Sequence, residues 1–435
     1  MFDILGPYFR RLEEFSVLRW VGRVTKSVGH LIESDGPNCS VGEGCAILTD
    51  DGQSFAGEIV GFRGRTVLSM PLESPSGIRF GDRIVTRGTR PSLRVGPNML
   101  GRVLDGSGKP LDGKLSYRAE MHWPLNGDAP LPLDRVPIRE PLGCGIRAID
   151  GMLTCGRGQR VGIFGGSGVG KSTLIGMMTR STQADMNVLA LVGERGREVR
   201  EFLEEAIGEE GMKRSVVLVS TSDQSPLLRI RAALAATAVA EYFSSQGKSV
   251  LLVVDSLTRF AMAQREIGLA AGEPPTSKGY TPSVFTLLAR LIERAGNFGK
   301  GSITAFYTVL MEGDDQQDPL VDAVRALLDG HIMLDRKLNS QGHYPPISVL
   351  DSLSRLMPAV CKPAHLEKAR KLRRLMASYA ASEDLIRVGA YQKGADAVLD
   401  RAIAALPATR AFLQQDKNDP APFDKTLDAL LALAE

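Results

Sequence analysis

One run of eight residues constrains this chain more than any other feature. The run is Gly165-Gly166-Ser167-Gly168-Val169-Gly170-Lys171-Ser172. It fits the pattern Gly-x-x-x-x-Gly-Lys-Ser/Thr, which cradles phosphate groups where it follows a strand and opens a helix. The apolar residues 160–164 predict that strand, and residues 171–181 predict that helix. The sequence therefore predicts a P-loop fold. The alternative, a glycine-rich turn with an incidental lysine, does not account for both flanking elements.

Each part of this phosphate loop has an expected task, and the predicted contacts extend as far as Thr173. The glycines let successive backbone N–H groups point inward, and the following helix adds its positive N-terminal end. Lys171 is expected to reach the β- and γ-phosphates of a nucleotide, and the Ser172 hydroxyl is expected to ligate Mg²⁺.

Apolar runs of strand length alternate with helical patterns between about residues 147 and 356. These runs lie at 160–164, 188–192, 215–219, 249–254 and 302–308. The alternation predicts an α/β fold, a RecA-like core with a mainly parallel sheet and helices on both faces.

The segments on either side of this core have different patterns of apolar and turn residues. Short strand-like runs separated by glycine turns between about residues 18 and 90 predict a small β-barrel, and residues 101–113 predict a turn-rich connector. After about Cys361 only helical patterns remain. We therefore predict three domains: 1–92 with the barrel, 93–360 as the ATPase-type core, and 361–435 as a helical domain.

The first twenty residues carry apolar side chains at nearly helical spacing. Two interpretations stay open for them: a short helix packed on its own domain, or a helix that docks onto a partner.

Two carboxylates follow predicted strands and complete the candidate site. Asp255 ends an apolar run, where such an aspartate holds the metal ion of a P-loop protein. Glu194 ends the run that begins near residue 188, at the strand edge where ligands bind to a parallel sheet. Glu194 is the candidate base that activates the attacking water. The alternative for Glu194 is an exposed, charge-rich turn.

The bulk composition narrows the class of protein. The 435 residues carry a formal net charge of +3, which gives no case for nucleic-acid binding by overall charge. Five cysteines form no CxxC pair, which favours a reducing cytoplasm over a disulfide framework. The sequence shows neither a signal peptide nor an apolar run of eighteen residues, so we expect a soluble internal protein.

Longer segments resemble the rotary ATP synthase catalytic subunits, a family that includes the ATPases of type III protein export. They are GGSGVGKSTL (165–174), GERGREVREF (193–202) and HYPPISVLDSLSR (343–355). The segments QREIGLAAGEPP (264–275) and LIRVGAYQKG (385–394) resemble the export branch, and the resemblance extends over nearly the whole chain. Residues 389–391 and 412–415 look more like the flagellar branch than the virulence-injectisome branch.

The resemblance implies roles for residues that match the family's motifs. Glu194 matches the catalytic glutamate, and Arg195 matches the arginine beside the γ-phosphate. Glu198 matches a second carboxylate near the metal-bound water, and Asp255 matches the metal aspartate. Tyr344 matches a position that packs on the adenine.

Arg355 matches the arginine finger that reaches into a neighbour's site. Because one chain carries both this finger and the residues of its own site, the resemblance implies a homomeric ring, with six copies the family expectation. Ser348 departs from the family, which commonly has an acidic or amide residue there, but this position touches no proposed catalytic atom.

The resemblance also implies ATP and Mg²⁺ as the bound groups, and several partners. These are a stator-like regulatory protein at the N-terminal segment, a coiled-coil stalk in the ring's pore, export chaperones and substrates at the C-terminal domain, and the export gate at the membrane. The implied location is the cytoplasm, peripheral to the inner-membrane export apparatus.

Two further classes of function remain as alternatives. A ring-shaped nucleic-acid translocase also joins a small barrel to such a core, but aromatic residues in the predicted barrel are few for a base-stacking platform. A non-catalytic nucleotide-binding subunit would lack the glutamate found at position 194. The expected protein is therefore an ATPase that energises export, with no nucleic-acid partner.

Overall fold

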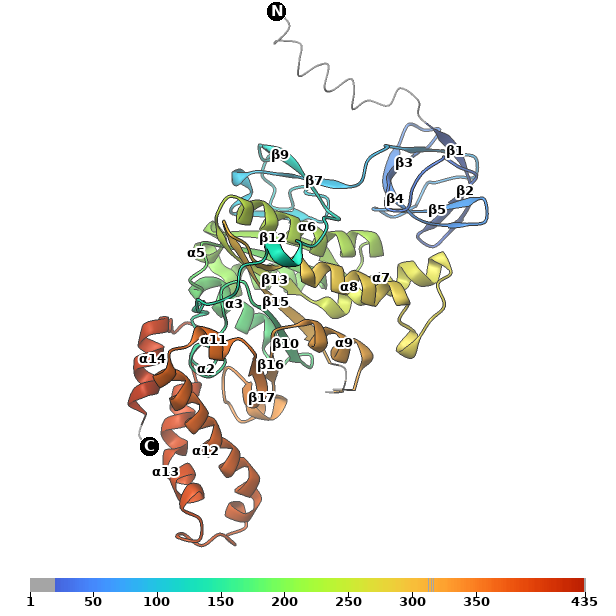
Figure 1. Ribbon diagram of the computed structural model, residues 1–435. Helices are drawn as coiled ribbons and strands as arrows, with labels where there is room; N and C mark the ends of the chain where they lie inside the picture. The colour runs from blue at the N-terminus through green and yellow to red at the C-terminus, as the bar shows by residue number, and fades with distance from the viewer. Residues whose placement is uncertain (1–19, 312, 314, 316, 434–435) are drawn as a thin grey trace, which may run out of the picture.

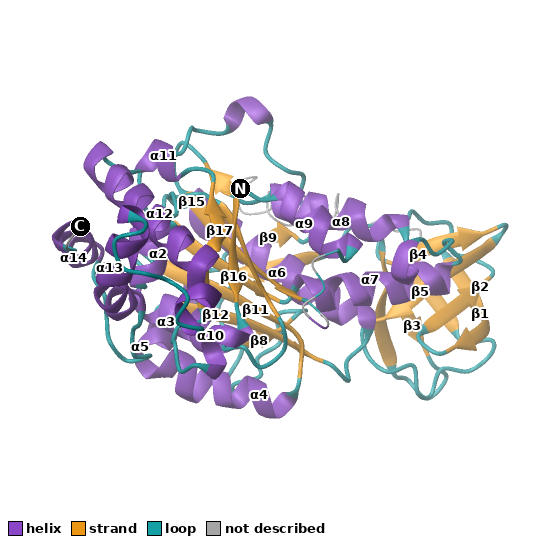
Figure 2. Cartoon of the chain, turned by 90° about the horizontal axis from the view of Figure 1, so that it is seen from below, coloured by secondary structure: helices purple, strands orange, loops and turns teal. Residues whose placement is uncertain are grey.

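The structure, a computed structural model, describes residues 20–311, 313, 315 and 317–433. The helix expected within the first twenty residues falls on residues 1–19, which lie outside the described residues. Figure 1 shows three parts: a barrel in blue, a central sheet covered by helices, and a group of red helices near the C-terminus. The barrel and the C-terminal helices lie at opposite ends of the core (Figure 2).

Six strands close into a small barrel in the order β1-β2-β5-β4-β3-β6, which confirms the predicted barrel. They are β1 (Val21–Val28), β2 (Leu31–Ser34), β3 (Gly44–Leu48), β4 (Ser54–Arg63), β5 (Thr66–Pro71) and β6 (Arg83–Thr86). Apolar side chains such as Ile32, Ile47 and Ile59 fill its interior and are fully buried. Closure leaves this sheet without a free edge strand.

The core is a nine-stranded sheet in the order β17-β16-β10-β15-β13-β11-β12-β8, with β14 paired to β15. Its strands are β8 (Arg102–Asp105), β10 (Arg160–Gly165), β11 (Met186–Glu194), β12 (Ser215–Thr221), β13 (Ser249–Asp255), β14 (Gly296–Asn297), β15 (Ser302–Leu310), β16 (Gly330–Leu334) and β17 (Ile347–Ser354). All neighbours are parallel except the β14–β15 and β16–β17 pairs. The predicted mainly parallel sheet is confirmed.

Alternate residues of the central strands enter two different hydrophobic cores. On β11, Val188 and Ala190 belong to the core beneath α6 (Pro226–Ser245), whereas Leu189 and Leu191 belong to the core beneath α3 (Lys171–Ser181). Because successive side chains of a strand point to opposite faces, a strand covered on both faces must be apolar throughout. This explains the unbroken apolar runs in the sequence.

Other helices complete the two layers of the core. They are α2 (Arg147–Met152), α4 (Gly196–Glu201), the π-helix η3 (Phe202–Ile207), α5 (Gly208–Lys213), α7 (Leu257–Ala271), α8 (Pro282–Glu293), α9 (Pro319–Leu327), α10 (Arg336–Ser340) and α11 (Met357–Val360). Three short 3₁₀ turns are η1 (Pro97–Met99), η2 (Pro132–Asp134) and η4 (Ser277–Gly279).

The segment expected as a turn-rich connector, 101–113, is only partly a connector. Its first residues form β8, which pairs with β12 as a parallel edge strand of the core sheet. The turn begins at Asp105, whose carboxylate accepts hydrogen bonds from the Ser107 and Lys109 backbone N–H groups. The strand was missed because four residues give too short an apolar run to stand out. A separate two-stranded sheet of β7 (Ser92–Val95) and β9 (Met121–Pro124) was also not predicted.

The C-terminal part is helical, as the sequence predicts: α12 (Pro363–Arg387), α13 (Ala397–Leu413) and α14 (Phe423–Ala432). Two predicted helices within 366–388 are one continuous helix, α12. His365 on α12 is buried and its Nε2 lies 2.8 Å from the Gly151 carbonyl oxygen of α2, which joins this part to the core. None of the helices in the described residues is long and apolar enough to cross a membrane.

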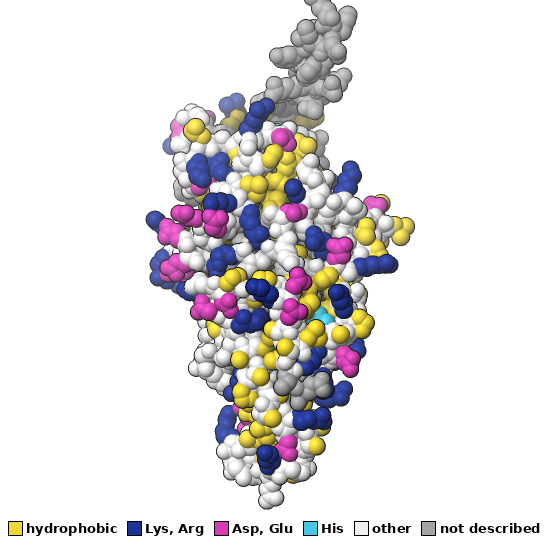
Figure 3. All heavy atoms as spheres, turned by 90° about the vertical axis from the view of Figure 1, so that its left-hand side faces the viewer, with side chains coloured by type: hydrophobic (Ala, Val, Ile, Leu, Met, Phe, Trp, Pro, Cys, Tyr) yellow, Lys and Arg dark blue, Asp and Glu magenta, His cyan; other side chains and the backbone are white. Residues whose placement is uncertain are grey.

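On the face drawn in Figure 3, Lys and Arg side chains are interspersed with Asp and Glu side chains. This mixture fits the near balance of 53 basic and 50 acidic residues in the chain. Hydrophobic side chains gather on the lower part of the same face, over the C-terminal helices.

Candidate active site

The phosphate loop follows β10 at the carboxyl edge of the sheet and leads directly into α3. Gly170 precedes the helix with φ of 97°, a left-handed conformation that favours glycine. A Cβ atom at Gly170 would also lie only 3.1 Å from the Tyr344 ring. Glycine at this position therefore serves both the curl of the loop and the close approach of Tyr344.

Lys171 is the first residue of α3 and is 9% exposed. Its Nζ is buried and has no hydrogen-bond partner among the described residues. Burial lowers the pKa of Lys171, while the carboxylates of Asp255 and Glu194 act in the opposite direction. A buried ammonium group without a partner is unfavourable unless an anion completes it. This orphaned group fits the phosphates of a nucleotide.

Asp255 and Glu194 end two neighbouring parallel strands, β13 and β11, at the same edge of the sheet. Asp255 is 6% exposed and accepts a hydrogen bond of 2.6 Å from the Thr308 hydroxyl. Burial raises the pKa of Glu194 to about 7, and the negative charge of Asp255 acts in the same direction. A carboxylate with a pKa near neutrality is suited to accept a proton at neutral pH.

The turn after Glu194 carries the other two charged candidates. Arg195 and Glu198 form an ion pair in which Nη1 and Oε1 lie 3.8 Å apart, and the Arg195 side chain is 76% exposed. Arg259 on α7 lies close to Glu194, with its Nε 3.4 Å from Glu194 Oε1. Sequence reasoning missed Arg259, because nothing in its local pattern distinguishes it from an ordinary helix residue.

These groups line one cavity of about 680 Å³. Of the predicted residues it brings together Ser167, Gly168, Gly170, Lys171, Ser172, Thr173, Glu194, Arg195, Glu198 and Asp255. Residues that were not predicted complete its wall: Thr258, Arg259, Met262, Leu310, Met311, Gly313 and Arg336. The loop residues Gly165, Gly166 and Val169 do not line it.

Tyr344 lies outside the cavity lining and packs against the phosphate loop. Its hydroxyl lies 3.4 Å from the Gly170 carbonyl oxygen, and its ring is half-buried. It therefore stands beside the loop, where a nucleotide base could reach it. Its contact with adenine stays a prediction.

The cavity offers oxygen ligands for a divalent cation through Ser172, Asp255 and Glu198. Within the described part of the chain, no cluster of three or more His, Cys, Asp or Glu side chains is arranged to hold a metal ion. Mg²⁺ normally binds through one or two protein groups together with phosphates and water, so this sparse set of ligands fits Mg²⁺ bound with a nucleotide.

Arg355 lies far from this cavity. It follows β17, which runs antiparallel to β16 with Ser354 opposite Gly330, so it stands level with the beginning of the parallel strands. The phosphate loop stands at their other end, about 20 Å away for six residues at roughly 3.3 Å each. Arg355 is exposed, and its guanidinium has no ion pair or hydrogen bond with another described residue.

A phosphate loop between a parallel strand and a helix, with a buried lysine beside strand-end carboxylates, defines a P-loop nucleoside triphosphatase. Comparisons with known proteins narrow this class. The ATP synthase alpha/beta family matches residues 145–354 with its nucleotide-binding domain and 24–88 with its β-barrel domain. The T3SS EscN ATPase C-terminal domain matches residues 361–432.

Individual relatives agree with this assignment. The chain is 54% identical to a flagellum-specific ATP synthase of Pseudomonas aeruginosa, over 91% of this chain and 88% of that protein. It is 47% identical to a type 3 secretion system ATPase of Xanthomonas euvesicatoria, over 98% and 97%. The solved structure of the assembled ATPase EscN of enteropathogenic E. coli, in complex with its central stalk EscO, matches with a TM-score of 0.88 and 42% identity. That match covers 95% of this chain and 99% of EscN.

The chain belongs to the ATP synthase alpha/beta family, and it is an ATPase with relatives in flagellar and type III secretion systems. The resemblance stated from the sequence is confirmed.

Proposed function

We propose that the chain hydrolyses ATP between neighbouring copies of a homo-hexameric ring, and that this energises the unfolding and export of flagellar proteins through a type III apparatus. One observation carries the shared site. Lys171 has a buried ammonium in the cavity without a hydrogen-bond partner among the residues that the structure describes, whereas Arg355 is exposed at the opposite edge of the same sheet. One copy thus presents both halves of a site but cannot bring them together.

Within the cavity each group has a distinct task. Lys171 binds the β- and γ-phosphates, and the loop N–H groups surround them. Ser172 and Asp255 hold Mg²⁺, with Glu198 near its water, and the ion when bound neutralises charge on the phosphates. Glu194 orients the attacking water and accepts its proton.

The arginines act on the charge that develops during bond cleavage. Arg195, which is exposed and lines the cavity, approaches the γ-phosphate. Arg355 of one copy reaches the nucleotide held by the next copy, through a heterologous interface that closes into a ring. Tyr344 packs on the adenine beside the loop.

The flagellar assignment is supported by relatives and by sequence segments. Flagellum-specific relatives reach 54% identity, although some are at 44%, compared with 47% for two type 3 secretion ATPases. Deleting the gene tests this assignment: we expect loss of swimming with host-directed secretion intact. Intact swimming with lost secretion would favour the injectisome alternative.

A solved relative supports one of the proposed partners. EscN binds a central stalk, EscO, and we propose a coiled-coil stalk in the pore of this ring too. A stator-like protein at the N-terminal segment, chaperones with their substrates at the C-terminal helices, and the export gate complete the assembly. The ATPase then works in the cytoplasm at the inner-membrane export apparatus.

The variant Glu194→Gln tests the proposed chemistry most simply. It keeps the size of the side chain but removes the base, so we expect ATP hydrolysis to fall by about 10²–10⁴-fold. Binding of a fluorescent ATP analogue should be retained. Lys171→Ala is the control, because it should lose nucleotide binding as well. Unchanged turnover in Glu194→Gln would remove Glu194 from this role.

A further inference from the structure

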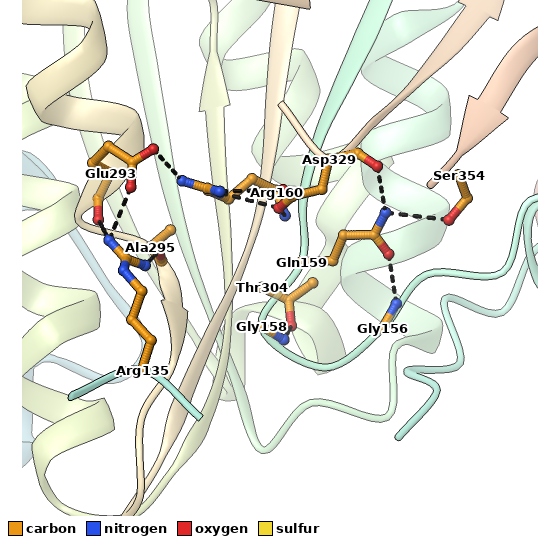
Figure 4. A network of polar contacts seen from close by, with 10 residues as sticks. All are labelled: Arg135, Gly156, Gly158, Gln159, Arg160, Glu293, Ala295, Thr304, Asp329 and Ser354. Carbon is orange, nitrogen blue, oxygen red and sulfur yellow. Dashed lines mark hydrogen bonds and ion pairs between the residues drawn. The ribbon is translucent and has the colours of Figure 1, made fainter. Parts of the chain in front are cut away.

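Gln159 is a fully buried carboxamide immediately before β10, and every part of it is engaged. Its Oε1 accepts a hydrogen bond of 2.7 Å from the Gly156 backbone N–H. Its Nε2 donates to the Asp329 carbonyl oxygen and to the Ser354 hydroxyl, each at 3.2 Å. Figure 4 shows the carboxamide lying between these partners.

Both partners of the Gln159 Nε2 also belong to the contacts that hold the backbone at Arg355. The Arg355 backbone N–H donates to the same Asp329 carbonyl oxygen, at 3.0 Å. Ser354 directly precedes Arg355, and its hydroxyl donates to the Thr154 carbonyl oxygen at 2.8 Å. Gln159 therefore holds the Ser354 side chain and the carbonyl oxygen that binds the Arg355 N–H, and so reaches the backbone at residues 354–355 through these two partners.

The direction of the Arg355 side chain depends on the backbone at residues 354–355. Within the described residues of its own copy, the guanidinium has no hydrogen-bond or ion-pair partner that would orient it. Without such a bond, the direction of this long side chain depends on its backbone. A displacement of about 1 Å at a reacting centre can reduce a rate by 10²-fold. The hydrogen bonds that hold the backbone at residues 354–355 therefore bear on catalysis.

The same network reaches the strand that carries the phosphate loop. The Asp329 carboxylate is held by Arg160, with Nε to Oδ2 at 3.0 Å and Nη2 to Oδ1 at 3.1 Å. Arg160 also donates from Nη1 to Glu293 Oε1, at 2.6 Å (Figure 4). Arg160 begins β10, and Gly165 at the other end of that strand begins the loop.

We propose that Gln159 is a positioning residue for Arg355, so that it acts on catalysis in the neighbouring copy rather than in its own. This inference rests on the proposed shared site. Gln159 touches no nucleotide, and its effect passes through the backbone at residues 354–355. The linkage along β10 connects one copy's phosphate loop with the finger it offers to the next copy.

The variant Gln159→Met tests this role because it keeps the length of the side chain and removes all three hydrogen bonds. We expect kcat to fall by about 10–10²-fold through misplacement of the finger. The affinity for a fluorescent ATP analogue should stay unchanged. In a double-mutant cycle, Gln159→Met should add little to the loss caused by Arg355→Ala.

Mixed rings then separate a role in the neighbour from a role in the same copy. Copies with Lys171→Ala cannot bind nucleotide but carry an intact finger, so mixing them with Gln159→Met should restore activity. At equal amounts about one interface in four pairs an intact finger with an intact loop. Mixing Gln159→Met with Arg355→Ala should restore nothing, since both lack a working finger.

Each other outcome overturns the proposal. Restoration by Arg355→Ala would place the defect of Gln159→Met in its own site. A second result would show the same. It is that Lys171→Ala fails to restore the activity of Gln159→Met, although Lys171→Ala and Arg355→Ala restore activity when they are mixed with each other. If that last pair fails to complement, the shared site itself is contradicted, and the role of Gln159 falls with it.

Two further variants guard against a general effect on folding. Asn187→Leu removes another fully buried carboxamide, bonded to the Thr179 carbonyl oxygen and the Ser215 hydroxyl, and should leave kcat near the unmodified value. If Gln159→Met does not assemble, Ser354→Ala takes its place in the same mixtures. It removes one hydroxyl of the network, so we expect a smaller loss of kcat and the same pattern of restoration in the mixed rings.

Discussion

Burial and charge act together on the few ionisable groups in the cavity. Lys171 is buried without a hydrogen-bond partner in the described part of the chain, and its pKa is lowered by that burial. Asp255 is also buried but is stabilised by the Thr308 hydroxyl. Glu194 is more exposed than either, with 18% of its side chain accessible, and has the raised pKa. These environments suit the proposed roles of the ammonium in phosphate binding, of Asp255 at the metal ion and of Glu194 in proton transfer.

The pKa of Glu194 gives a prediction for the pH dependence of hydrolysis. The free protein has this pKa at about 7, and a base acts only when it is unprotonated. The value of kcat/KM reports the ionisation of the free enzyme, so kcat/KM should rise as the pH increases through about 7. Steady-state hydrolysis measured from acidic to alkaline pH checks this expectation.

Arg259 supplies the control for that pH profile. Its positive charge lies 3.4 Å from Glu194 and lowers the carboxyl pKa. In Arg259→Gln the rise of kcat/KM should therefore move to higher pH. A profile that moved to lower pH, or did not move, would show that another group titrates.

The elements that carry the site follow from sequence patterns of different strength. The helix after the phosphate loop was predicted to its bounds and the strand before it to within one residue, because a motif and a strong apolar run coincide there. The strand β8 was missed, since an edge strand of four residues leaves little trace in the sequence.

Side-chain partners were harder to predict than strands and helices. Arg259 and Gln159 lie far along the chain from the groups they contact, at Glu194 and Ser354. Only the sheet order brings these pairs together, and no local pattern in the sequence records that order.

The helix α3 is held close to the π-helix η3 by Gly176. A Cβ atom at Gly176 would lie 2.6 Å from the Ala206 carbonyl oxygen. Alanine normally stabilises a helix relative to glycine by roughly 1 kcal/mol. In this contact we expect Gly176→Ala to destabilise the protein instead, by about 1–3 kcal/mol, because the overlap forces the two elements apart.

Urea unfolding of Gly176→Ala measures this change. Gly196→Ala in α4 is the matched control, since its added Cβ would meet nothing within 4 Å. An unfolding midpoint for Gly176→Ala at or above that of the unmodified protein would show that α3 and η3 are not in tight contact.

At the scale of the whole molecule, the barrel and the C-terminal helices lie at opposite ends of the core (Figure 2). The two halves of the proposed site lie at opposite edges of the sheet. On the proposed shared site, a single copy would be incomplete as a catalyst, and assembly would be part of the chemistry.

This incompleteness predicts that specific activity depends on protein concentration. An arginine finger contributes a factor of about 10³–10⁵ in rate. ATP hydrolysis per copy should therefore rise steeply as copies assemble, in step with the mass measured by light scattering. Flat specific activity across the assembly range would indicate that one copy suffices.

The most direct measurement is a structure of the assembled protein with a non-hydrolysable ATP analogue and Mg²⁺. The quantity to read is the distance from the Arg355 guanidinium to the γ-phosphate held by Lys171 of the adjoining copy. The shared site predicts a charge-assisted hydrogen bond of about 2.7–2.9 Å there. An Arg355 buried within its own copy, away from every bound nucleotide, would contradict it.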